Sequence, residues 1–272
     1  MARERRRPPR RSDLGARVLA AIPAIAFAIF IVAQGGLVFT LGLIALGVLA
    51  LHELYTMTER VQPAKIAGFI SLAALLLVAL YGDQFQILLV LALAVPLTFG
   101  FSLLRPHREN VSWAVAVTLL GVLWVGVALA HAVLLRELPH GDGLVIDVLV
   151  GTFIGDSAAY FAGRAYGRHP LAPRISPNKT LEGLIGGLVG GTAAFWFAGL
   201  YQDWLSGLDA LVIGVCVAIA APIGDLFESL LKRDLEVKDT GRFFGAHGGV
   251  LDRLDAVFFT AVTAYYLSVA LL

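Results

Sequence analysis

Acidic and basic side chains gather in one short stretch of an otherwise apolar chain, between positions 221 and 255. On a helix that turns about 100° per residue, five polar groups of this stretch fall within an arc of about 140°. They are Asp225, Glu228, Ser229, Lys232 and Arg233. A loop rich in charge and glycine follows, and it leads to two further carboxylates, Asp252 and Asp255, at the mouth of the last apolar run. The spacing predicts that these acids and bases converge.

Converging carboxylates and basic groups are suited to the handling of phosphate. Two or more carboxylates can hold Mg²⁺, which takes oxygen ligands and keeps substrate phosphates in its coordination shell. Lysine and arginine neutralise the phosphate charge that the metal leaves over, and glycines let the backbone approach phosphate oxygens closely. The stretch therefore predicts a phosphoryl- or nucleotidyl-transfer site, in which positioning and charge stabilisation carry the catalysis.

Two segments upstream add further polar groups. Asp156 lies inside an apolar run, where a carboxylate costs at least about 2.5 kcal/mol unless it is paired or hydrated. Residues 176–183 read Ser-Pro-Asn-Lys-Thr-Leu-Glu-Gly. Ser176 or Asn178 is expected to cap a helix whose free N–H groups and partial positive charge suit phosphate, and Lys179 adds a full charge there.

Each of these signals also has a plainer interpretation. Asp156 could make a helix-packing hydrogen bond, and residues 176–183 could be an ordinary cap. Lys232 and Arg233 could extend their charges to the membrane interface, as such side chains commonly do. That explanation does not cover Asp225 and Glu228, which lie deeper in the run. For the glycines at 183, 187 and 191, the four-residue spacing predicts close helix packing rather than ligand contact.

The elements that position these residues must lie in lipid. Hydrophobic residues make up 58% of the 272 positions and charged residues only 15%, with a mean hydropathy of +0.80. A soluble domain has about a quarter of its residues charged, so this chain cannot cover its surface with water-facing groups. The single cysteine, Cys216, excludes an intramolecular disulfide and is interpreted as a packed thiol.

Nine predominantly apolar runs are long enough, or nearly so, to cross a hydrocarbon core of about 30 Å. They cover residues 17–33, 37–55, 66–82, 85–103, 111–135, 144–163, 181–201, 208–230 and 254–272, with a turn at Gln34–Gly36. With the N-terminus in the cytosol, this count puts twenty of the 21 lysines and arginines on the cytosolic side and only Arg136 opposite. The sequence thus predicts an all-α polytopic membrane protein of about nine transmembrane helices, with its C-terminus on the opposite side.

The chain is predicted to be one membrane domain behind a basic tail. Residues 1–16 form the cytosolic tail, whose arginines are expected to anchor an uncleaved first span rather than a secretory signal. Residues 17–272 form the transmembrane domain. Within it, residues 17–143 carry few polar groups and are interpreted as scaffold spans, whereas residues 144–272 carry the catalytic spans and loops.

Three motifs resemble those of one enzyme family. Residues 229–255 contain Ser-Leu-Leu-Lys-Arg, Lys-Asp-Thr-Gly and His-Gly-Gly-Val-Leu-Asp-Arg-Leu-Asp, a pattern similar to the signature of phosphatidate cytidylyltransferases, also called CDP-diacylglycerol synthases. Residues 155–164 and 176–183 resemble the two upstream motifs of that family, in the expected order. The departures are small: Gly245-Ala246 stands where the family often has Pro-Gly, and Gly155 precedes the aspartate where serine or alanine is more usual.

The resemblance implies a reaction and a set of site residues. CTP and phosphatidate would give CDP-diacylglycerol and pyrophosphate, with Mg²⁺ held by Asp225 and Asp252; a second, monovalent cation is left open. The implied catalytic positions are Asp156, Lys179, Glu182, Ser229, Lys232, Arg233, Lys238, Asp239, His247 and Arg253. The implied substrate-binding positions are Ser176, Asn178, Lys179, Ser229, Lys232, Arg233, Lys238, Gly248 and Gly249. A phosphate nucleophile needs no general base, so His247 is as well explained by orienting the glycine turn.

The resemblance also implies a setting, and two other functions compete with it. The enzyme would be a homodimer in a bacterial-type plasma membrane, with its site facing the cytosol, lipid around it and no nucleic-acid partner. A CTP-dependent polyprenol or lipid kinase would use the same nucleotide, but would transfer its γ-phosphate to an alcohol. An ion-coupled transporter could also carry intramembrane carboxylates, but should place them near mid-bilayer and often shows paired repeats.

Overall fold

The computed structural model describes residues 12–105, 109–237, 240–241 and 248–272, and the side chains from residue 22 onward. Within these residues the chain is helical apart from one short β-hairpin and its loops. The helices are α1 Ser12–Gln34, α2 Gly36–Met57, α3 Lys65–Tyr81, α4 Gln84–Leu103, α5 Val111–Gly121, α6 Val127–Glu137, α7 Gly141–Tyr166, α8 Leu181–Gly199, α9 Gly207–Asp234 and α10 Leu251–Leu271. A 3₁₀ turn (η1, Glu59–Val61) follows α2, and a π-helical segment (η2, Val122–Gly126) joins α5 to α6.

The nine apolar runs of the sequence all coincide with helices in the described part of the chain. The run at 111–135 corresponds to α5, η2 and α6 together, which form one continuous helix. Seven of these described helices are long and apolar enough to cross a membrane. Two others have shorter apolar stretches, Ile22–Gln34 in α1 and Lys65–Tyr81. The predicted turn after Gln34 is confirmed, since Gly35 and Gly36 adopt φ values of 64° and 46° that favour glycine. The all-helical fold is therefore confirmed, while the number of spans stays a prediction.

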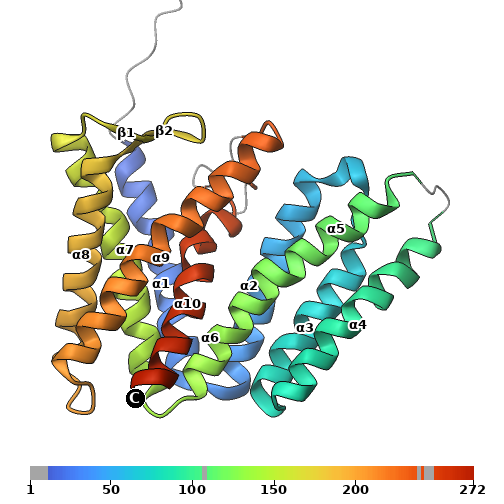
Figure 1. The fold of residues 1–272 in the computed structure, drawn as a ribbon, viewed down its shortest axis with the longest axis horizontal. Coiled ribbons are helices and arrows are strands. Elements are labelled where there is room, and N and C mark those ends of the chain that lie inside the picture. The colour runs from blue at the N-terminus through green and yellow to red at the C-terminus, as the bar shows by residue number, and fades with distance from the viewer. Residues whose placement is uncertain (1–11, 106–108, 238–239, 242–247) are drawn as a thin grey trace, which may run out of the picture.

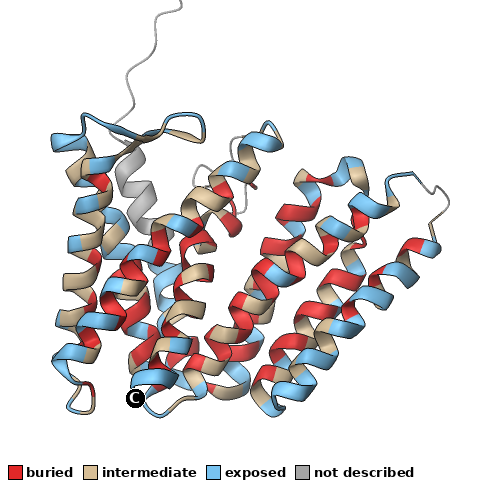
Figure 2. Cartoon of the chain, viewed as in Figure 1, coloured by how far each residue is buried: buried red, intermediate tan, exposed pale blue. Residues whose placement is uncertain are grey.

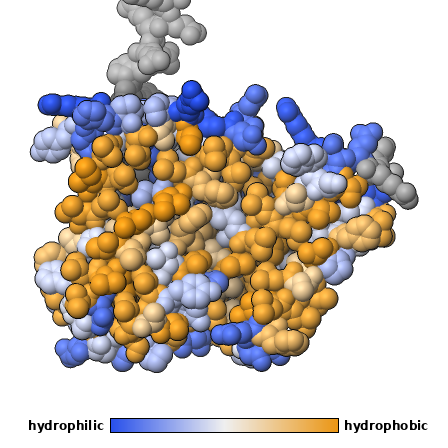
Figure 3. All heavy atoms as spheres, viewed as in Figure 1, coloured by the Kyte–Doolittle hydropathy of each residue, from blue (hydrophilic) through white to orange (hydrophobic). Residues whose placement is uncertain are grey.

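The rods run side by side between two hydrophilic ends. The hairpin, the end of α9 and the start of α10 lie at one end of the molecule, and the C-terminus lies at the other (Figure 1). An apolar band separates the two ends on the face shown in Figure 3. Many large apolar side chains of the described helices are exposed, among them Phe85, Leu88, Phe161 and Val189. A surface of this kind needs a lipid environment, so the chain is an integral membrane protein.

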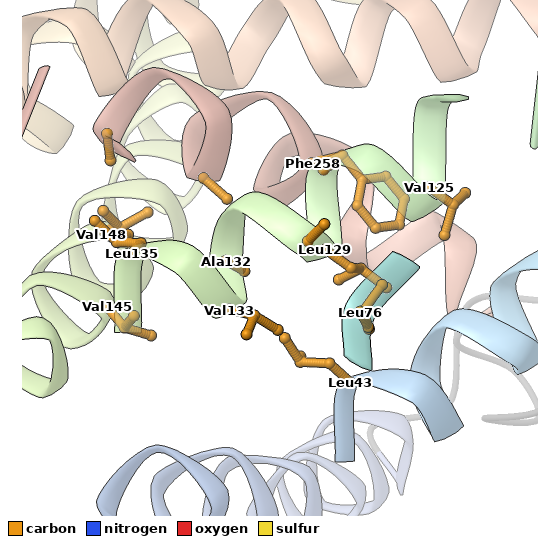
Figure 4. Close-up of a cluster of buried hydrophobic side chains, with 14 of the residues drawn as sticks. Leu43, Leu76, Val125, Leu129, Ala132, Val133, Leu135, Val145, Val148 and Phe258 are labelled. Carbon is orange, nitrogen blue, oxygen red and sulfur yellow. The ribbon is translucent and has the colours of Figure 1, made fainter. Parts of the chain in front are cut away.

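A core of buried aliphatic side chains holds the rods together (Figure 2). Side chains of α2, α3, α6, α7 and α10 meet in it, and Leu43, Leu76, Leu129, Val148 and Phe258 are among those drawn in Figure 4. Within this core, Trp124 of η2 packs edge-to-face against Phe258 of α10, and also against Phe227 of α9 at its margin. The scaffold half and the catalytic half therefore share one packed interior.

Helices α7 and α8 approach each other closely along their glycines. A Cβ atom placed on Gly187 would lie 2.9 Å from the Cβ of Ala159, and one on Gly191 would lie 3.0 Å from the carbonyl oxygen of Gly151. Neither glycine has room for a side chain, so their role is close backbone approach. The prediction that this glycine stripe packs helices is confirmed.

The segment before α8 corrects one expectation. Residues Ser176–Thr180 form a strand (β2) that pairs antiparallel with Pro170–Ala172 (β1), so neither Ser176 nor Asn178 caps the helix. Pro177 disfavours a helical conformation for the residue before it, which keeps this segment extended. The cap is Thr180, whose hydroxyl accepts a hydrogen bond of 3.1 Å from the N–H of Gly183.

Candidate active site

Lys232 joins helices α9 and α10 at the hydrophilic end that carries the hairpin. Its ammonium donates to Glu228 Oε2, one turn earlier on α9, at 2.6 Å and to Asp252 Oδ1, in the first turn of α10, at 2.9 Å. Glu228 is buried and the Lys232 side chain is only 17% exposed. Glu228 and Lys232, two members of the polar arc predicted for α9, therefore face the start of α10 rather than lipid.

Asp252 is bonded on both of its oxygens. While Oδ1 accepts from Lys232, Oδ2 accepts from the backbone N–H of Gly249 at 2.7 Å and of Thr240 at 3.2 Å. Gly248 adopts φ +82°, a left-handed conformation that favours glycine, and a Cβ there would collide with the Asp252 carboxylate. The loop thus folds back onto the carboxylate that follows it.

A second ion pair connects the hairpin to α9. The ammonium of Lys179, in β2, contacts Oδ2 of Asp225, whose side chain is about one-third exposed. Asp156, an exposed residue of α7, lies near enough to both groups for their charges to interact. Three segments far apart in sequence therefore bring Asp156, Lys179 and Asp225 together, as the motifs predict.

Asp255 links the two groups of charges. It is buried on α10, accepts a hydrogen bond from the N–H of Ala256 at 2.8 Å and interacts with Glu228 and Asp225. We call these residues the acidic cluster: Asp156, Asp225, Glu228, Asp252 and Asp255, with Lys179 and Lys232. Among these seven described residues, carboxylates outnumber lysines by three, so the group as a whole favours cations.

The donor chemistry of the acidic cluster suits Mg²⁺. Among the residues that the structure describes, no three metal-binding side chains converge into a closed site. Mg²⁺ does not need one, because it binds through one or two carboxylates and completes its shell with water and substrate phosphates. Glu228 Oε1 is buried without a hydrogen-bond partner in the described structure, so the cluster has an oxygen to spare. The residues present fit the metal.

Two other predicted site residues hold the hairpin in place. The Arg233 Nε–H donates to the carbonyl oxygen of Ile175 at 3.0 Å. Glu182 accepts from the backbone N–H groups of Arg168 and His169 at 3.0 and 3.2 Å, and from the ring of His169 at 2.6 Å. Both side chains therefore position the segment that carries Lys179.

The remaining predicted residues lie around this framework. Ser229 in α9 and Ser176 in β2 are half-buried, whereas Asn178 in β2 and Arg253 in the first turn of α10 are exposed. Gly248 and Gly249 adjoin the acidic cluster through Asp252. Lys238, Asp239 and His247 lie outside the described residues.

A sequence model described as the Cytidylyltransferase family matches residues 15–271. The chain belongs to this family. A phosphatidate cytidylyltransferase of Bacillus subtilis is 31% identical over 264 residues, covering 94% of this chain and 97% of the relative. Proteins of the same name from Staphylococcus epidermidis and Brucella suis are each 32% identical, over 89% and 93% of this chain and 94% and 93% of their own. The match of this cytidylyltransferase spans the scaffold helices as well as the motifs.

One residue of this cytidylyltransferase was not predicted from the sequence. Glu53, near the end of α2, is buried and accepts hydrogen bonds from the N–H groups of Val250 at 3.0 Å and Leu251 at 2.9 Å. It comes from the half interpreted as scaffold, where its position at the end of an apolar run resembles an interfacial charge. The available signal was a carboxylate two residues before the end of the apolar run at 37–55.

Proposed function

We propose that this cytidylyltransferase transfers CMP from CTP to phosphatidate, giving CDP-diacylglycerol and pyrophosphate. The observation that carries the proposal is a match to phosphatidate cytidylyltransferases along nearly the whole chain. An oxygen of the phosphatidate phosphate attacks the α-phosphorus of CTP, and the bond from that phosphorus to the pyrophosphate oxygen breaks. Both substrates are anions, so their phosphates must be brought together against mutual repulsion.

The residues of the acidic cluster have distinct roles in this proposal. Asp225 and Asp252 would hold Mg²⁺, which supplies charge neutralisation for the phosphates when it is bound. Lys179 and Lys232, each already paired with one of these carboxylates, are placed to turn toward phosphate oxygens as substrates enter. Ser229, Lys238 and the glycines at 248 and 249 would contribute further phosphate contacts. The nucleophile is a phosphate, so no residue is needed as its general base.

The membrane setting completes the proposal. All nine apolar helices would span the lipid, with the N-terminus, the hairpin and the acidic cluster facing the cytosol of a bacterial-type plasma membrane. This orientation is supported by the twenty lysines and arginines assigned to that side. The lipid phosphate then lies at the headgroup level and CTP arrives from the aqueous side. We also expect a homodimer.

Labelled nucleotide tests the reaction directly. The purified protein in detergent is given phosphatidate, Mg²⁺ and CTP labelled at either the α- or the γ-phosphate. Label from the α-phosphate alone should enter lipid, with release of pyrophosphate. Lipid labelled by the γ-phosphate with a polyprenol acceptor would instead identify a lipid kinase. If no acceptor gives labelled lipid, both enzyme hypotheses are contradicted, and the transporter hypothesis is the one left.

A further inference from the structure

Glu53 is a buried carboxylate whose described partners all belong to the segment that carries Asp252. Its Oε1 accepts from the Val250 N–H, and its Oε2 accepts from the Leu251 N–H and from the Thr240 hydroxyl at 3.4 Å. Val250 is the N-cap of α10 and Leu251 its first residue, and amide groups at this end of a helix have no partner within the helix. Val250 provides no side-chain cap, so Glu53 caps α10 from another helix.

The backbone of the loop fits closely around this carboxylate. A Cβ atom on either Gly241 or Gly249 would collide with the carboxylate oxygens of Glu53. Gly241 follows α9 and Gly249 precedes α10, and both lie against the same side chain. Only residues without a side chain allow this approach, so the backbone at these two positions fits around Glu53.

Glu53 itself is held in a rigid setting. Leu51, Leu54 and Tyr55 beside it are fully buried, and the Tyr55 hydroxyl donates to the carbonyl oxygen of Thr118 in α5 at 3.0 Å. The end of α2 is thereby fixed to α5, so the carboxylate is a stable reference point. Its negative charge at the α10 N-terminus is favourable because of the helix dipole.

We propose that Glu53 is a positioning residue for catalysis, which holds Thr240 and residues 249–251 in place and thereby sets the carboxylate of Asp252. The inference rests on the proposed function for its catalytic meaning. Asp252 Oδ2 accepts from Thr240 and Gly249, so the same loop residues that contact Glu53 also hold the predicted metal ligand. Loss of Glu53 would release Thr240 and residues 249–251 and, with them, the orientation of Asp252 toward Lys232.

Glu53→Gln tests the inference with little change in size. The amide NH₂ cannot accept from backbone N–H, so one oxygen's contacts are lost. We expect the kcat/KM for CTP to fall at least tenfold. Amide hydrogen exchange at residues 250 and 251, followed by mass spectrometry in detergent, should accelerate at least tenfold, while exchange in α7 and α8 and the apparent melting temperature stay close to the parent. Glu59→Gln, at an exposed carboxylate just past the end of α2, is the matched control and should change none of these.

Parental exchange at residues 250 and 251 in the Glu53→Gln variant would overturn the proposal. Faster exchange throughout the protein, with a lowered melting temperature, would also overturn it, because Glu53 would then act on overall stability. The exchange measurement needs no turnover, so it decides the matter even if the parent protein lacks cytidylyltransferase activity.

A second set of variants tests the contact from the loop side. Gly249→Ala should lower kcat/KM at least tenfold, because its methyl group meets the Glu53 carboxylate. In the Glu53→Ala/Gly249→Ala double variant the methyl group gains room. The kcat/KM of the double variant should therefore be no lower than that of the less active single variant, as expected for residues in direct contact. Losses that simply multiply would show that the two positions act separately and would overturn the proposal.

Discussion

At the scale of single residues, the two aspartates predicted as metal ligands differ in their surroundings. Asp225 pairs with Lys179 and is partly exposed, whereas Asp252 accepts three hydrogen bonds at the foot of α10. In the proposed function, both carboxylates bind Mg²⁺ beside the substrate phosphates. The loss of a metal ligand removes charge stabilisation worth several kcal/mol in the transition state.

We therefore expect Asp225→Asn and Asp252→Asn each to abolish measurable CMP transfer while the protein stays folded. Activity across a Mg²⁺ titration, with the apparent melting temperature measured in parallel, checks the expectation. Asp234→Asn, at an exposed aspartate on the end of α9, is the control and should retain parental activity. Near-parental turnover of either site variant at saturating Mg²⁺ would contradict the metal assignment.

Lys232 gives a second test, because its charge can be kept while its shape is changed. If it merely extended a charge to the membrane interface, Lys232→Arg would change little. In the structure its ammonium fits between Glu228 and Asp252, and the broader planar guanidinium of arginine does not replace a compact ammonium there. We expect CMP transfer to fall at least about tenfold, on the order of 1.4 kcal/mol in the barrier. Parental rates in a folded variant would show that Lys232 is an interfacial anchor.

Arg233 tests the hairpin rather than the acidic cluster. Its Nε–H bond to the Ile175 carbonyl helps to hold the strand that carries Lys179. Arg233→Lys keeps the charge but loses this donor geometry, so we expect CMP transfer to fall at least about tenfold. Expression and melting temperature should stay close to the parent. A rate equal to that of the parent would mean that the hairpin needs no such contact.

At the scale of elements, the glycine contact between α7 and α8 sets the distance between Asp156 on α7 and Lys179 just before α8. The two helices approach closely because glycines lie at their interface. Any added volume there must separate the helices, and overpacking of this kind costs about 1–3 kcal/mol.

Gly187→Ala should therefore lower both the apparent melting temperature and the rate of CMP transfer, because its Cβ would lie 2.9 Å from that of Ala159. Gly100→Ala on α4 is the matched control, since nothing lies within 4 Å of a Cβ there. Thermal unfolding in detergent and the labelled-CTP assay measure the two effects. Equal behaviour of the two variants would show that the interface tolerates the methyl group.

The same elements show what the sequence could and could not predict. Asp225, Glu228 and Lys232 repeat at helical spacing within one apolar run, so their shared face could be predicted from local geometry. The cap of α8 was misplaced because Ser176 and Asn178 are good capping residues, and only the pairing of β1 with β2 makes them extended. Glu53 was missed because its partners lie nearly two hundred residues away, beyond the reach of any local pattern.

At the scale of the whole molecule, the hairpin and the loop between α8 and α9 lie at opposite ends (Figure 1). Single cysteines at positions 174 and 201, both exposed, can report these ends in a Cys216→Ser background. We expect an impermeant thiol reagent to label position 201 in intact cells and position 174 only in inverted vesicles. Labelling of position 174 from outside the cell would reverse the proposed orientation.

The bond from Glu53 to Leu251 also has a consequence for biogenesis. The two residues are 198 positions apart. At a synthesis rate of about 5–20 residues per second, α2 is made on the order of 10 to 40 s before its partner exists. During that time the carboxylate must stay hydrated at the membrane surface or be shielded by the insertion machinery. Assembly of this end of the protein is therefore a late step, and a chain that stops before α10 would display an unsatisfied acid to cellular quality control.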